Sequence, residues 1–268
     1  MKLSQFPIYI IDAFTKELFK GNQAAVVPLD SWLPEGVMQN IASENNLSET
    51  AFFVRNDVGV YEIRWFSPLK EIDFCGHATL ASAYVIFTHL GEKGTITFWA
   101  KAVGSIEVNE RDNERIEMRF PNREPEVLSE VPEALKNGLS IKPLEYHKNQ
   151  QAYFAVYASE EDVKNVVPDL EKLKTLAPLD VVVTAPSRAY DFASRYFWPA
   201  NGGVEDPVTG SIHAGLAPFW AKRLGKNELI ALQASARSGV LYCRVSEGYI
   251  FISGMCKEYL EGNITLTY

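Results

Sequence analysis

An internal repeat constrains the fold of this chain more than any other feature of its sequence. The stretch Arg64-Trp-Phe-Ser-Pro68 matches Arg195-Tyr-Phe-Trp-Pro199 in the pattern Arg-aromatic-Phe-x-Pro. Each copy is followed by a glutamate and, five residues later, a glycine: Glu71 and Gly76 in the first copy, Glu205 and Gly210 in the second. Several landmarks in one order indicate an ancient duplication, so we expect two modules of one architecture.

Each copy continues into an apolar run that ends at a second glycine. Fifteen residues separate Gly76 from Gly91, and fifteen separate Gly210 from Gly225. The two runs predict helices that are apolar nearly all round, and the closing glycines are typical C-terminal stops. A helix of this kind has to be enclosed, and the neighbouring strands are the available cover.

Strands are predicted where residues alternate in polarity or are β-branched. The predicted strands are Pro7–Ala13, Thr50–Val54, Tyr61–Phe66, Gly94–Ala100, Ser105–Val108, Arg115–Phe120, Val181–Thr184, Arg195–Trp198, Gly239–Val245 and Tyr249–Ser253. Segments 34–44 and 159–176 predict amphipathic surface helices. We therefore expect an α+β fold of two pseudo-symmetric modules, each a curled β-sheet or barrel around a central helix. The expected modules are 1–122 and 123–268, with a linker near 121–132 and a last strand, 263–268, that can cross back to complete the first module.

Composition narrows the classes of partner. The 268 residues include 26 Lys and Arg against 34 Asp and Glu, so the net charge is −8. This balance argues against nucleic acid or an anionic membrane as partner, while small anions stay open. The apolar run 78–87 is too short to span a membrane, and Asp12 interrupts the N-terminal apolar stretch, which argues against a signal peptide. The three cysteines form no CxxC pair, so we expect a cytoplasmic protein.

The two helix starts are candidate anion sites. Gly76-His77 and Gly210-Ser211 each follow a tight turn and open an apolar helix. The first amides of a helix lack internal partners and carry partial positive charge, which suits a carboxylate or phosphate. The alternative is that each glycine only permits the turn, with His77 and Ser211 as N-terminal caps. The paired occurrence favours the anion site.

Several stretches carry a resemblance to a known family. They are Asp12-Ala-Phe-Thr15, Phe19-Lys-Gly-Asn-Gln-Ala-Ala-Val26, Asn46-Leu-Ser-Glu-Thr-Ala-Phe52, Asp73-Phe-Cys-Gly-His-Ala-Thr-Leu-Ala81, Glu205-Asp-Pro-Val-Thr-Gly-Ser211 and Gln233-Ala-Ser-Ala-Arg237. Together they resemble the PhzF-like family, which is named for a phenazine-biosynthesis isomerase and is related to diaminopimelate epimerase. The resemblance spans nearly the whole chain.

The resemblance implies a diaminopimelate-epimerase-like fold, an active site between the two modules, and a homodimer. It implies proton transfer on a small carboxylate-bearing substrate, without metal or organic cofactor. By motif, Glu49 is the expected general acid/base, and His77 and Asp206 are expected to bind and orient the substrate. Gly76, Gly210 and Ser211 are expected to hold its carboxylate, in agreement with the helix-start argument.

The residues themselves leave alternatives open. Glu49 precedes an apolar strand, where a partly buried carboxylate can move a proton between carbons, but a strand-end surface charge fits the pattern too. Glu44 is the nearest rival and lies in a polar helix tail. A two-thiol racemase is disfavoured because Thr209 stands at the repeat position of Cys75, so Cys75 is interpreted as small apolar filling. No cluster with metal spacing and no nucleotide-binding glycine motif occurs in the sequence.

Two other functions stay open beside the cofactor-independent isomerase. One is a two-base racemase or epimerase of amino-acid-like substrates, in which Asp206 supplies the second base. The other is a protein that binds small anions and has lost catalysis. Isotope exchange and stereochemical outcome separate the three.

Overall fold

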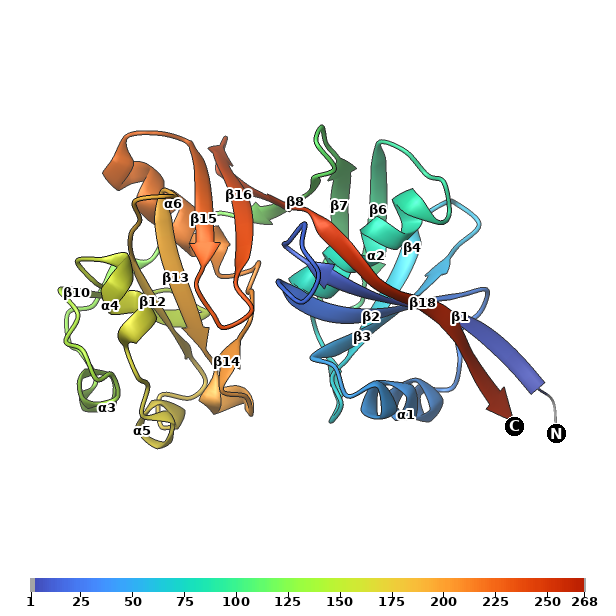
Figure 1. Cartoon of the computed structure of the whole chain (residues 1–268), viewed down its shortest axis with the longest axis horizontal. Coiled ribbons are helices and arrows are strands. Elements are labelled where there is room, and N and C mark those ends of the chain that lie inside the picture. Colours follow the sequence, from blue (N-terminus) through green and yellow to red (C-terminus); the bar gives the residue numbers. More distant parts are fainter. Residues whose placement is uncertain (1–2, 268) are drawn as a thin grey trace. The chain divides into compact units, whose positions relative to one another are not determined.

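The computed structural model describes residues 3–267, which divide into two compact units (Figure 1). Of the described residues, 3–119 and 253–267 form unit 1, and 120–252 form unit 2. The C-terminal residues belong with unit 1 because β18 (Cys256–Thr267) pairs antiparallel with β1 (Leu3–Ala13), from Leu3 opposite Thr267 to Ala13 opposite Cys256. Within the described residues, no helix is long and apolar enough to cross a membrane.

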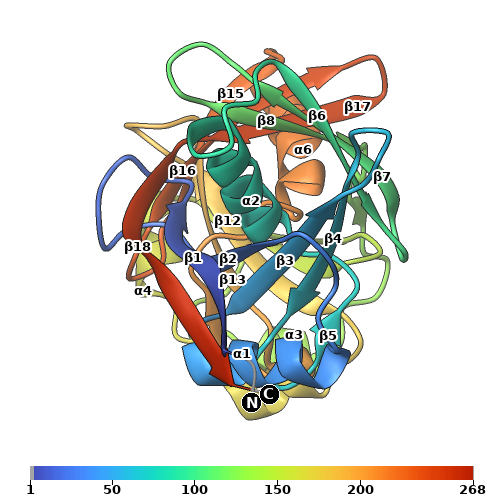
Figure 2. The same ribbon diagram turned by 90° about the vertical axis from the view of Figure 1, so that its right-hand side faces the viewer.

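Unit 1 is a curled sheet with one helix on each face. Besides β1 and β18, its elements are β2 (Asn22–Leu29), α1 (Glu35–Asn45), β3 (Glu49–Arg55), β4 (Tyr61–Phe66), β5 (Glu71–Ile72), α2 (Gly76–Thr88), β6 (Thr95–Ala100) and β7 (Gly104–Glu110). Strand β2 pairs with β1 and, in parallel, with β3, and β4 then pairs with β3, β5 and β6. Helix α2 packs against β1, β2 and β3 and is buried over most of its length, as the sequence predicts (Figure 2).

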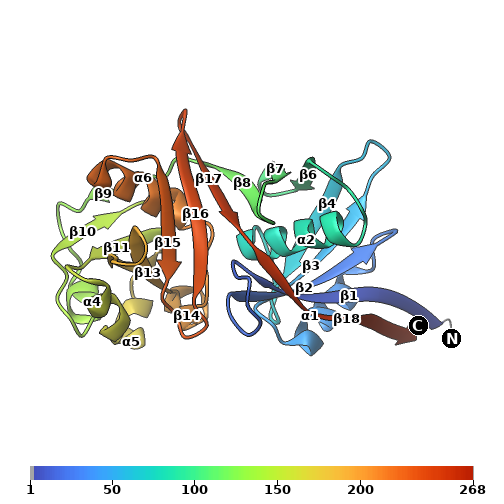
Figure 3. The same ribbon diagram turned by 45° about the horizontal axis from the view of Figure 1, so that its top comes forward.

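Unit 2 repeats this plan. Its elements are β9 (Glu126–Val127), α3 (Glu133–Asn137), β10 (Glu145–Lys148), β11 (Ala152–Val156), α4 (Glu160–Asn165), α5 (Leu170–Lys174), β12 (Asp180–Pro186), β13 (Phe192–Phe197), the 3₁₀ turn η1 (Pro199–Asn201), β14 (Glu205–Asp206), α6 (His213–Leu224), β15 (Glu228–Gln233) and β16 (Gly239–Ser246). Strand β11 pairs in parallel with β12, and β13 pairs with β12, β14 and β15. Helix α6 lies on the other side of these strands from α4 and α5 (Figure 3). Strands β8 (Ile116–Pro121) and β17 (Tyr249–Gly254) carry the chain across the unit boundaries.

The strand pairings of the two units show the repeat that the sequence predicts. In unit 1, β4 is antiparallel to β3 and β5 and parallel to β6, with α2 between β5 and β6. In unit 2, β13 stands in the same relation to β12, β14 and β15, with α6 between β14 and β15. The shared arginine has the same role in both copies: Arg64 binds Glu71 through two hydrogen bonds, and Arg195 binds Glu205 in the same way.

Each sheet buries a hydrophobic layer under its outer helices. In unit 1 this layer contains Ala25, Val27 and Leu29 of β2 together with Met38 and Ile41 of α1. Because side chains alternate across a strand, the intervening residues of β2 face the opposite side, where α2 packs. The corresponding layer of unit 2 lies under α4 and α5 and includes Val163, Leu173 and Phe197.

The structure corrects one predicted helix and adds several strands that the patterns do not predict, among them β2, β10, β11 and β15. Segment 159–176 forms two short helices, because Pro168 has no N–H to donate and disfavours helical geometry at the residue before it. Strands β2 and β11 were missed. Both are central strands with a parallel neighbour and layers on both faces, so their apolar residues do not alternate with polar ones.

Candidate active site

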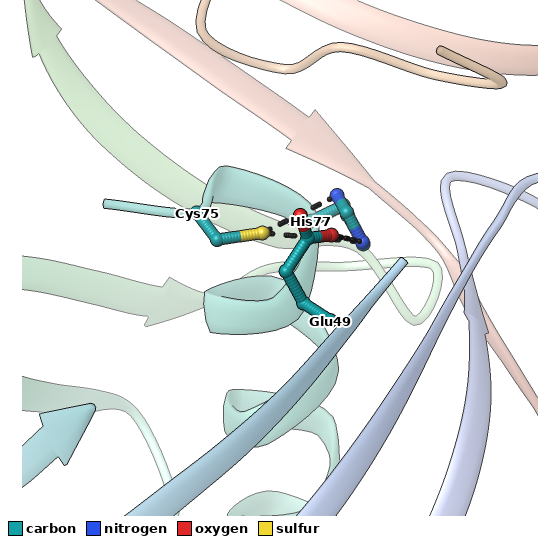
Figure 4. A group of neighbouring side chains, drawn as sticks. All are labelled: Glu49, Cys75 and His77. Carbon is teal, nitrogen blue, oxygen red and sulfur yellow. Dashed lines mark hydrogen bonds and ion pairs between the residues drawn. The ribbon is translucent and has the colours of Figure 1, made fainter. Parts of the chain in front are cut away.

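Glu49 and His77 lie side by side in unit 1. Glu49 is the first residue of β3, and its side chain is 12% exposed. Its Oε2 lies 3.0 Å from Nε2 of His77 in the first turn of α2 (Figure 4). The contact has ion-pair distance but lacks hydrogen-bond direction, so this buried oxygen makes no directed hydrogen bond within residues 3–267. An acceptor lone pair of the carboxylate is therefore left for a further proton.

Asn22 holds the other side of the His77 ring. Its side-chain amide nitrogen lies 3.1 Å from Nδ1 of His77, and both residues are buried. The chain reaches Asn22 through Gly21, whose φ is +67° and where a Cβ would stand 2.2 Å from the carbonyl oxygen of Ala13. Only glycine fits this turn, so Gly21 sets where Asn22 enters β2.

His77 is poised to carry a positive charge beside Glu49. Burial alone lowers the pKa of His77, but Cys75 and Glu49 together raise it well above its ordinary value. Burial, followed by the negative charge of Glu49, raises the pKa of the Cys75 thiol to about 11. The thiol therefore keeps its proton at neutral pH. At this pH the negative charge that raises the pKa of His77 comes from Glu49.

Cys75 is more than apolar filling. It is buried at the N-terminal end of α2, and its Sγ lies 3.4 Å from Nδ1 and 3.9 Å from Nε2 of His77. Helix geometry places residues 75 and 77 on the same turn, so the thiol completes a Cys75–His77–Glu49 cluster. The sequence-based interpretation of Cys75 as filling was incomplete, because the approach of Glu49 from β3 is a tertiary contact.

The same three side chains are a candidate donor set for a metal, since their ligand atoms lie within 4.8 Å of one another. A metal binds one ring nitrogen of a histidine. The carboxylate stands at Nε2, whereas the sulfur is nearer to Nδ1, so the donors do not converge on one ring nitrogen. A second group, His89 with Glu258 and Glu261, lies at the surface of unit 1.

Asp206 belongs to a polar cluster in unit 2. It ends β14, and the hydroxyl of Thr209 donates to its Oδ2. Gln233, fully buried at the end of β15, donates to the backbone carbonyl of Asp206 and accepts the N–H of Thr209 at 2.8 Å. Thr209 therefore orients the Asp206 carboxylate, and Gln233 fixes the loop that carries both.

Gly210 and Ser211 form the turn before α6. The side-chain amide nitrogen of Gln151 donates to Oγ of Ser211 at 2.9 Å. Within residues 3–267, the backbone N–H groups of Gly210, Ser211 and Ile212 donate to no backbone carbonyl. This turn therefore presents several hydrogen-bond donors together, which suits an anionic ligand.

The structure thus brings Glu49, His77 and Gly76 together in unit 1, and Asp206, Gly210 and Ser211 together in unit 2. Sequence reasoning missed Gln151 and the orienting roles of Asn22, Thr209 and Gln233. Asn22 and Gln233 lie inside stretches that carry the family resemblance, and this position could have indicated their roles. No pattern marked Gln151.

Comparison with known proteins identifies the family. The PhzC-PhzF family model, described as phenazine biosynthesis-like protein, matches residues 11–256. An uncharacterized isomerase of Pseudomonas aeruginosa is 44% identical over 262 residues, covering 98% of this chain and 100% of the relative. The chain belongs to the phenazine biosynthesis-like, or PhzF, family. A crystal structure of a PhzF-family protein from Enterococcus faecalis matches 98% of the chain and 100% of that protein with a TM-score of 0.94 and 43% identity.

More distant structures share the fold of this PhzF-family chain. A hydroxyproline epimerase from Agrobacterium vitis covers 98% of the chain, and 93% of that protein is matched, with a TM-score of 0.61 at 9% identity. The fold is thus of the epimerase type that the sequence predicts. The relatives identify the chain as an isomerase.

Proposed function

We propose that this isomerase moves a proton on a small carboxylate-bearing substrate, with Glu49 as the general acid/base. The observation that carries the proposal is the difference between the two candidate bases in unit 1, Cys75 and Glu49. The Cys75 thiol, with a pKa raised to about 11 by burial, holds its proton, whereas the Glu49 carboxylate has a buried oxygen without a directed hydrogen bond. The carboxylate is therefore the better candidate for the general base.

His77 supports this role through charge. Its Nε2 lies 3.0 Å from the carboxylate, so a charged imidazole holds the carboxylate in place by ion pairing. The carboxylate then returns the proton to another carbon of the same face, which is a one-base isomerisation. In the proposal His77 and Asp206 also orient the substrate, while Gly76, Gly210 and Ser211 bind its carboxylate.

The test is deuterium incorporation from ²H₂O, followed by NMR. Wild type and Glu49→Gln are incubated with a panel of cyclic and amino-acid carboxylates that includes proline and trans-4-hydroxy-L-proline. The matched control is Glu44→Gln, which makes the same chemical change on the exposed side of α1. Because general acid/base catalysis contributes about 10²–10⁴-fold, Glu49→Gln is expected to lose at least about 100-fold of the exchange rate, and Glu44→Gln none.

The outcomes separate the alternatives. Exchange that survives in Glu49→Gln contradicts the assignment. Inversion at a single carbon, lost in both Glu49→Gln and Asp206→Asn, identifies a two-base epimerase. Carboxylate binding without any exchange identifies a binding protein.

A further inference from the structure

Unit 1 contains a cavity of about 690 Å³ beside strand β4. The first residue of α1, strands β4 and β5 and the segment 99–102 line this cavity, whereas Glu49 and His77 do not. A volume of this size suits a small organic ligand. Because carboxylates outnumber cations in the lining, the cavity favours a positively charged ligand. The charged residues of the lining are Glu35, Glu62, Arg64, Glu71, Asp73 and Lys101.

Glu62 has no cationic partner in the part of the chain that the structure describes. By contrast, Glu35 and Glu71 both bind Nη2 of Arg64, at 2.9 and 2.6 Å. Glu62 is half-buried in β4, and its Oε2 accepts a hydrogen bond from Nε1 of Trp32 at 3.2 Å. The indole fixes the carboxylate but leaves its charge uncompensated. This negative charge is therefore available to a ligand in the cavity.

Trp99 stands next to Glu62 on the neighbouring strand. The parallel register of β4 and β6 sets Glu62 opposite Trp99, so the two side chains lie on the same face of the sheet. The residues before them, Tyr61 and Phe98, are buried on the opposite face. Trp99 is 44% exposed, although tryptophan is usually well buried. A carboxylate and an accessible indole thus lie together in the wall of the cavity.

Elsewhere in the chain, a carboxylate beside an aromatic ring holds an arginine. In three cases the guanidinium binds one carboxylate through two nitrogens, and its central carbon lies 4.1–5.2 Å from the centroid of an aromatic ring. A guanidinium is planar, so it can bond in its plane and stack through its face at the same time. The three sets are Arg64 with Glu71 and Phe66, Arg195 with Glu205 and Phe197, and Arg223 with Glu145 and Phe219.

We propose that Glu62 and Trp99 bind the guanidinium group of a small molecule that enters this cavity. They are the same combination of carboxylate and ring, but the chain supplies no arginine to them. The carboxylate of Glu62 accepts the N–H groups of the ligand, and the indole of Trp99 stacks on its face. The ligand class is an alkylguanidine, and the site is separate from the proposed proton transfer.

The test uses three probes that share a butyl chain: butylguanidinium, its neutral isostere butylurea, and butylammonium. Dissociation constants of the full-length protein are measured by NMR titration of the tryptophan indole N–H signals. Charge-assisted hydrogen bonds are expected to make butylguanidinium bind at least about tenfold more tightly than butylurea. Butylammonium lacks the planar fork and is expected to bind at least about threefold more weakly than butylguanidinium. The signals of Trp32 and Trp99 should shift, and that of Trp220 in unit 2 should not.

Glu62→Gln removes the charge but keeps an oxygen that can accept from Trp32. It is expected to lower the affinity for butylguanidinium at least about tenfold. The matched control is Glu107→Gln, at an exposed glutamate of β7 outside the cavity lining, and it is expected to leave the affinity unchanged. Trp99→Leu is expected to cost about threefold, because the cation loses the indole face. Lys101→Ala removes a competing cation and should not weaken binding. Thermal unfolding of each variant checks that it is folded.

Three results overturn the inference: a wild type that binds none of the probes, equal binding of butylguanidinium and butylurea, or an unchanged affinity in Glu62→Gln. Equal binding of butylammonium also contradicts a guanidinium site, because charge alone is then recognised. An arginine-containing tripeptide is titrated in parallel, and binding of this peptide without binding of butylguanidinium would replace the small molecule by a partner protein. The proposed proton transfer is judged separately, because Glu49→Gln is expected to keep butylguanidinium binding while losing deuterium exchange.

Discussion

Glu49 and Asp180 occupy the same position of the internal repeat, yet only Glu49 has a buried oxygen without a directed hydrogen bond. The duplication therefore supplied two carboxylates, one of which faces an imidazole while the other is bound by a phenol and an amide. Asp206, by contrast, corresponds in register to Ile72 of β5 and has no acidic counterpart in unit 1. This asymmetry favours chemistry with a single base.

Replacing His77 by asparagine is expected to lower deuterium exchange by about 100-fold, because the carboxylate loses its positive partner. Since the folded pKa of His77 is raised, wild-type exchange should be highest below that pKa and fall as pH rises through it, above 6.5. The measurement is the pH dependence of the exchange rate. His77→Asn should lack this alkaline decline, and an unchanged decline in the variant would contradict the role of His77.

Cys75 is expected to be unreactive in the native protein. Its thiol is buried with a pKa of about 11, and only thiolates react readily with iodoacetamide. Mass spectrometry after treatment at pH 7.5 should find Cys75 labelled in urea but not in the folded protein. Cys75→Ala should keep at least about a third of the exchange rate, whereas a loss comparable to that of Glu49→Gln would make the thiol a catalytic group.

His213 is expected to make stability depend on pH. It is fully buried, with Nδ1 2.9 Å from the carbonyl oxygen of Thr209, and burial lowers its pKa to about 4. Between pH 6.5 and 4 the unfolded chain binds the proton that the folded protein excludes, so stability falls as pH falls. Urea unfolding should show wild type losing about 2 kcal/mol more than His213→Asn between pH 7 and pH 5. Parallel losses in the two proteins would contradict this.

The repeated arginines are expected to differ in their contribution to stability. Arg195 is 14% exposed and, besides Glu205, donates to the carbonyl oxygens of Val163, Lys164 and Val166 at the end of α4. Arg64 is 28% exposed, and its hydrogen bonds within the described residues go to the carboxylates of Glu71 and Glu35. We expect Arg195→Met to cost about 2–3 kcal/mol in free energy of unfolding and Arg64→Met about 1 kcal/mol. Chemical denaturation of both variants measures the difference, and equal losses would count against it.

The sequence predicts an element correctly where the residues of that one segment form a clear pattern. The enclosed helices α2 and α6 were predicted because their runs are apolar all round and end at Gly91 and Gly225. The duplication is visible in the Arg-aromatic-Phe motif, because its arginine forms the corresponding ion pair in each unit. Strands β2 and β11 escaped prediction, because strands covered on both faces show no alternation of polar and apolar residues.

The sequence by itself determined the class of fold, its duplication, the family resemblance and the candidate residues Glu49, His77, Asp206 and Ser211. Only the tertiary structure decided which side chains meet. Cys75 and Glu49 converge on His77, and Asp180 holds Gln151 against Ser211 through Tyr196. The physical reason is that sheet register and helix packing bring together residues far apart in the chain, and no local pattern records that pairing.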